Sequence, residues 1–145
     1  MGREYDTAAS WGRDGDLKAR TKGYALRVIA LVDALPRTRS AEVIGRQLLR
    51  CATSVGANYR AARRGRSDAD FIAKLKIVEE EADECLYWLE LLTESGMVRA
   101  EQVADVYAEG NAILAITIAS IKTMRERQQR RARAITDQRS DRDAD

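Results

Sequence analysis

Two arginine-rich segments carry the clearest chemical potential in this sequence. Residues 46–66 hold six arginines and no acidic residue, and residues 125–133 (RERQQRRAR) hold five arginines against one glutamate. Guanidinium groups bind phosphate oxygens without reading bases, so both segments are candidates for contact with the backbone of RNA or DNA. The candidate phosphate-binding residues are Arg60, Arg63, Arg64, Arg66, Arg125, Arg127, Arg130, Arg131 and Arg133.

An acidic block offers a structural explanation for the first arginine segment. Glu79, Glu80, Glu81, Asp83 and Glu84 follow it closely in the sequence, so ion pairing within or between subunits would use the arginines for assembly. The second segment has no such block left to neutralise it, although the acid-rich end of the chain could screen it. The formal net charge is only +2, so binding of a polyanion depends on local clustering.

A polar ladder is predicted one helical turn apart at Arg50, Ser54 and Asn58. Asn58 falls on an apolar stripe, where a buried amide costs stability unless it is hydrogen-bonded. Such residues can fix helix register or oligomeric state. We expect the ladder to reach Glu84 or Glu81 and to serve structure rather than catalysis.

The chain contains no histidine, which excludes Ser-His-Asp and Cys-His nucleophile systems and Glu-x-x-His di-iron sites. The two cysteines, Cys51 and Cys85, are too few for a structural zinc site and fall on apolar stripes, where we expect buried free thiols. We read the acidic block as a solvated face rather than a cation site. No metal, no cofactor and no enzymatic activity are predicted.

Four amphipathic segments must position these residues. Apolar residues recur at three- and four-residue steps over about 16–35, 40–64, 67–95 and 100–125, with short connections between them. This pattern predicts an all-α fold, an antiparallel up-down four-helix bundle. We expect a flexible leader at 1–15, the bundle at 16–125, and a basic then acidic tail at 126–145 that is partly disordered. Ser40 and Ser67 are the expected N-caps of the second and third helices.

Apolar residues beyond the main stripe of the third helix predict self-association. Leu86, Tyr87, Trp88 and Leu91 lie off that stripe, and an exposed apolar surface of this size usually marks an interface. No apolar stretch approaches the roughly 20 residues that span a bilayer. With few cysteines and no apolar N-terminal segment, we expect a cytoplasmic protein without membrane contact.

The run 46–92 resembles the four-helix-bundle proteins named after the 23S ribosomal RNA intervening sequences that encode some of them. The matching residues are Arg50, Ala52, Ser54-Val55, Asn58, Arg66-Ser67, Phe71 and Glu84, while Gly56 and Ala61-Ala62 depart from the pattern. The resemblance, weaker over 16–125, implies ring-shaped homopentamers. It also implies kinship with the accessory protein of diversity-generating retroelements, which is thought to bind RNA and a reverse transcriptase.

Two functions follow. The first is a non-enzymatic oligomeric scaffold that binds RNA or DNA nonspecifically through its arginines. The second is a protein–protein adaptor, for example to a reverse transcriptase, whose arginines serve oligomer assembly.

Overall fold

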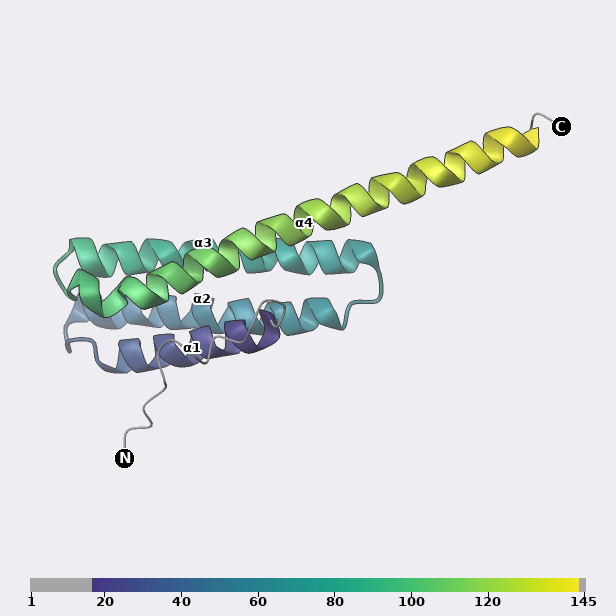
Figure 1. The fold of residues 1–145 in the computed structure, drawn as a ribbon. Helices are drawn as coiled ribbons and strands as arrows, with labels where there is room; N and C mark the ends of the chain where they lie inside the picture. Colours follow the sequence, from purple (N-terminus) through teal and green to yellow (C-terminus); the bar gives the residue numbers. More distant parts are fainter. Residues whose placement is uncertain (1–16, 144–145) are drawn as a thin grey trace.

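The computed structural model describes residues 17–143, and the predicted leader lies outside them. Within this range the chain forms α1 (Leu17–Asp33), α2 (Arg39–Arg63), α3 (Asp68–Glu94) and α4 (Ala100–Asp143). Each helix packs against the next one in the chain, and α1 also packs against α4 (Figure 1). The predicted all-α, antiparallel up-down four-helix bundle is confirmed.

The helix boundaries follow local capping chemistry. Thr38, not the predicted Ser40, caps α2, because its hydroxyl accepts a hydrogen bond from the Ala41 amide at 3.2 Å. Ser67 caps α3 as predicted, accepting from the Asp70 amide at 3.1 Å. Gly96 follows α3 with a φ of +79°, a left-handed conformation that glycine adopts without strain.

The apolar stripes of the four helices meet in one core. Its largest fully buried apolar side chains include Leu48, Val55, Leu75, Leu89, Leu92 and Ile113. Cys51 and Cys85 are both free and buried, with their sulfur atoms 3.0 Å apart. The hydrogen bond to Cys51, and then burial, raise the pKa of the Cys85 thiol. The Cys85 thiol therefore stays protonated, and both buried cysteines pack as small core side chains.

A buried ion pair joins α1 to α4. Arg20 donates two hydrogen bonds to the Glu109 carboxylate, at 2.8 Å and 3.1 Å, and both side chains are at least 85% buried. The next residue, Gly110, lets α4 approach this region closely, because a Cβ there would lie 3.0 Å from both the Tyr24 hydroxyl and the Leu86 side chain. The pair and the glycine together fix the register between α1 and α4.

The helix α4 continues to Asp143, well beyond the bundle boundary expected near Arg125. The end of the chain that we expected to be partly disordered is therefore helical over its described residues. Arginine, glutamine and alanine favour helix, and Glu126 lies one turn before Arg130 in the favourable order for an ion pair along a helix. Figure 1 shows this part of α4, residues 125–143, extending past the connection between α2 and α3. We call it the α4 extension.

Arg20→Met should lower the free energy of unfolding by about 3 kcal/mol, because it leaves the Glu109 carboxylate buried without its partner. The double variant Arg20→Met, Glu109→Met should recover most of this loss, since it removes both charges. Urea denaturation followed by circular dichroism measures both. A single variant as stable as the wild type would show that the pair does not hold α1 to α4.

Candidate nucleic-acid interface

The first arginine cluster lies where α2 ends. Arg60 and Arg63 occupy the last turn of α2, Arg64 is its C-cap and Arg66 lies in the connection to α3, all with exposed side chains. Cations at this position interact favourably with the negative end of the helix dipole. The fold therefore tolerates a concentration of positive charge here.

The second arginine cluster passes the same end of the bundle. Arg131, in the α4 extension, donates to the Asp68 carboxylate at the start of α3, with an Nη1–Oδ2 distance of 2.6 Å. Asp68 lies only two residues after Arg66, so this contact brings the two arginine segments to one end of the molecule. We call this region the basic end, and it comprises Arg60, Arg63, Arg64, Arg66, Arg125, Arg127, Arg130, Arg131 and Arg133.

Most guanidinium groups of the basic end keep their hydrogen-bond donors for a ligand. All nine residues are exposed, and within residues 17–143 no carboxylate pairs with Arg60, Arg64, Arg66, Arg125, Arg127, Arg130 or Arg133. At about 100° per residue, the five arginines of residues 125–133 are spread around the helix. This distribution suits contact with phosphates from several directions rather than docking to one flat partner.

The predicted polar ladder divides into two separate sets of contacts. Arg50 crosses to α3, where it donates to Glu81 at 3.2 Å and to Glu84 through a short hydrogen bond. Glu84 also accepts a hydrogen bond from the Trp88 indole at 3.2 Å. Asn58 instead donates to the carbonyl and hydroxyl oxygens of Ser54, at 2.9 Å and 2.8 Å, and does not reach α3.

Asn58 is also less buried than the sequence suggested. The 3.6-residue repeat turns the apolar face of α2 so that Tyr59, which is only 7% exposed, fills the core near the end of the helix. Asn58 is half-buried beside it. The side-chain amide of Asn58 forms its hydrogen bonds within α2. The register between α2 and α3 therefore depends on the Arg50 contacts rather than on Asn58.

Within residues 17–143, Arg50 is the arginine of the first segment that forms ion pairs with Glu81 and Glu84 of the acidic block. Because α2 and α3 run antiparallel, Glu81 and Glu84 lie beside Arg50 and not beside the end of α2. The hypothesis of structural ion pairing therefore holds for Arg50. It does not account for Arg60, Arg64 or Arg66, for which the described residues offer no carboxylate.

The predicted interface residues differ in burial. Leu86 is only 6% exposed and packs near Gly110 within the chain's own core, so its assignment to an exposed surface is wrong. Trp88 and Leu91 are half-buried, while Tyr87 is 53% exposed and contacts the Trp88 ring with centroids 5.1 Å apart. Leu86 was misplaced because α4 covers a wider face of α3 than one narrow stripe.

Two contacts left no local signal in the sequence. Arg131–Asp68 and Arg20–Glu109 join residues 63 and 89 positions apart, and each depends on how α4 crosses its neighbours. Among the described residues, no three histidine, cysteine or acidic side chains gather closely enough to hold a metal ion. None of the described helices combines the length and the apolar character needed to cross a membrane.

The geometry defines a class of protein: an all-α four-helix bundle with a long last helix and cations gathered at one end. Residues 13–119 match the family of 23S rRNA-intervening sequence proteins, and the chain belongs to that family. The α4 extension lies beyond the matched residues.

A solved structure supports this assignment. The chain is similar to a protein of unknown function from the S23 ribosomal protein family of Bacteroides thetaiotaomicron VPI-5482, with 37% sequence identity and a TM-score of 0.69. The similarity covers 72% of this chain and 97% of that one. Among curated proteins, none matches this chain.

Replacing Glu84 by Gln tests the Arg50 contact through its pH dependence. The hydrogen bond from Arg50 holds the pKa of Glu84 below its ordinary value of 4.5, so the contact stabilises the fold above that pH and fades as pH falls through the lowered pKa. Because the pair is largely exposed, we expect a loss of at most about 1 kcal/mol near neutral pH. Urea denaturation at a series of pH values from about pH 7 into acid should show that the difference from wild type shrinks as the pH falls through the lowered pKa of Glu84. A difference that is unchanged in acid would contradict this account.

Proposed function

We propose that this protein is a non-enzymatic, oligomeric helical scaffold that binds RNA or DNA without sequence specificity through the basic end. The observation that carries this proposal is the Arg131–Asp68 contact, which places both arginine segments at the same end of the bundle. Neither segment alone would distinguish a phosphate-binding surface from ordinary surface charge. Their convergence gives nine exposed arginines that could act on one ligand.

The mechanism is neutralisation of phosphate charge. Exposed guanidinium groups displace condensed counterions from the nucleic acid, so the affinity must fall steeply as salt concentration rises. No phenylalanine, tyrosine or tryptophan occurs in the α4 extension, so base stacking contributes little there. Because the arginines contact phosphates rather than base edges, the binding is indifferent to base sequence.

Self-association would multiply this effect. The half-buried Leu91 and the exposed Tyr87 leave part of an apolar face on α3 available for a second copy. The family resemblance implies a homopentameric ring. If several basic ends face one nucleic acid, avidity raises the affinity although each chain carries a net charge of only +2.

An adaptor function is the second candidate, and a groove between α3 and α4 favours it. The groove has a volume of about 520 Å³ and is lined in part by Glu90, Val103 and Tyr107, at the opposite end of the bundle from the arginines. Tyr107 donates to Glu90 at 2.7 Å, leaving an apolar floor with an acidic edge. A protein partner, for example a reverse transcriptase, could dock there while the arginines serve assembly.

Charge reversal at the basic end tests the scaffold. Two double variants are compared: one carries Arg64→Glu and Arg66→Glu, and the other carries Arg130→Glu and Arg133→Glu. Each should lose about tenfold or more in affinity for a generic RNA at about 50 mM salt, with a shallower salt dependence. Fluorescence anisotropy measures both quantities. The matched control, Arg37→Glu, Arg39→Glu, changes the same charge at the other end of the bundle and should bind nearly as wild type. Equal losses in all three variants would reduce the effect to net charge and count against a defined site.

The adaptor account makes a different prediction for the same end. If the arginines hold subunits together, Arg63→Glu, Arg64→Glu should dissociate the oligomer, because it places like charges across the subunit contact. In the scaffold account the oligomer stays intact while nucleic-acid binding weakens. Sedimentation velocity of this variant separates the two.

A further inference from the structure

A groove between α1 and α2 is lined by three cations and no carboxylate. Its volume is about 370 Å³, and its lining includes Lys18 and Lys22 from α1 and Arg60 from α2. The two lysines are four residues apart, so they project from the same face of α1. Among the described residues none of the three cations forms an ion pair, so no carboxylate of residues 17–143 neutralises them.

Gly56 keeps this groove open. A glycine inside a helix costs up to about 1 kcal/mol relative to alanine. A Cβ at Gly56 would lie 3.5 Å from the Thr21 carbonyl and hydroxyl oxygens, which is ordinary contact, so packing does not require glycine here. The helix therefore gives up stability at a position whose main structural effect is a side-chain-free floor between the cations.

The lining defines the chemistry of the ligand. Besides the cations it contains Thr21, Ala25, Thr53, Gly56 and Ala57, with no aromatic ring on which a nucleobase could stack. Three positive charges around a floor of small side chains match phosphate oxygens, which accept hydrogen bonds from ammonium and guanidinium groups. The groove would therefore hold phosphate and leave bases unread.

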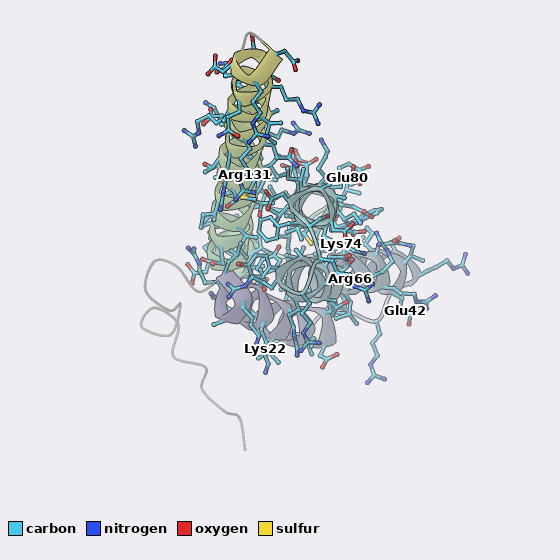
Figure 2. The ribbon with its side chains drawn as sticks, turned by 90° about the vertical axis from the view of Figure 1, so that its right-hand side faces the viewer. Lys22, Glu42, Arg66, Lys74, Glu80 and Arg131 are labelled. Carbon is cyan, nitrogen blue, oxygen red and sulfur yellow. The ribbon has the colours of Figure 1, made fainter. Side chains whose placement is uncertain are left out.

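Arg60 connects the groove to the basic end. It lines the groove and also lies one turn before Arg63 and Arg64, on the same face of α2. Figure 2, which looks along the bundle, places Lys22 on the side of the molecule away from Arg131, with Arg66 on the α2–α3 side. A strand that contacts the basic end can therefore continue past Arg60 onto a second side of the bundle.

We propose that the α1–α2 groove binds backbone phosphates of the same RNA or DNA strand that contacts the basic end. This inference rests on the proposed function and extends it, because it adds Lys18 and Lys22 to the contact surface and directs the strand around the end of α2. The groove supplies the phosphate contacts that follow Arg60 along the strand.

The test compares three full-length variants in salt-dependent RNA binding. Lys18→Ala, Lys22→Ala should weaken binding about tenfold at about 50 mM salt and reduce the slope of log affinity against log salt by about two. Gly56→Leu fills the groove without changing charge and should also weaken binding severalfold. Arg37→Ala, Arg39→Ala is the control that removes the same charge at the far end of the bundle, and its slope should match wild type. Circular dichroism verifies that each variant is folded.

The outcomes separate this inference from the proposed function. If Lys18→Ala, Lys22→Ala keeps the wild-type slope while Arg64→Glu, Arg66→Glu loses binding, the groove inference is overturned and the basic end stands. If the wild-type protein shows no salt-dependent binding, both are overturned. Calorimetry with inorganic tripolyphosphate examines the other source of phosphate. Binding of tripolyphosphate that the lysine variant abolishes, with RNA affinity unchanged, would also overturn the assignment to a nucleic-acid strand.

Discussion

Short connections between helices are the constraint on which the arrangement of this protein depends. Each helix must return along the one before it, so α2 and α4 run in the same direction and finish at the same end of the bundle. The first arginine segment reaches the end of α2, and the second lies where α4 passes that end of the bundle. Their convergence is therefore a consequence of the up-down topology, and the Arg131–Asp68 contact is where it becomes visible.

The contact between the first and last helices closes the bundle. α1 is the shortest helix and packs against α4 along a limited surface. A bidentate ion pair and a glycine hold this junction, where Arg20 meets Glu109 and Gly110 admits Tyr24. Since buried charges are strongly destabilising without their partner, the pair also disfavours other registers of α1 against α4. A fixed α1 in turn sets the position of Lys18 and Lys22 beside α2.

The sequence alone was sufficient to predict the features of the fold that depend on local residue patterns. The apolar repeat predicted the helices and their order, and Ser67 was recognised by its capping chemistry. The predictions that failed had both local and long-range causes. Leu86 was assigned to an exposed surface because the sequence of α3 alone does not show how wide a face α4 covers. Asn58 was assigned to the apolar stripe of α2 because a strict heptad step drifts against a 3.6-residue repeat. The extent of α4 was underestimated because its last part lacks an apolar stripe and is stabilised by helix propensity and the Asp68 contact.

The most direct test of the account is light scattering coupled to size exclusion, with and without a generic RNA, at about 50 mM and about 200 mM salt. The account predicts an oligomer whose mass increases with RNA at the lower salt and returns to that of the free oligomer at the higher salt. An oligomer whose mass is unchanged by RNA at both salt concentrations would contradict it and would leave the basic end without a nucleic-acid ligand.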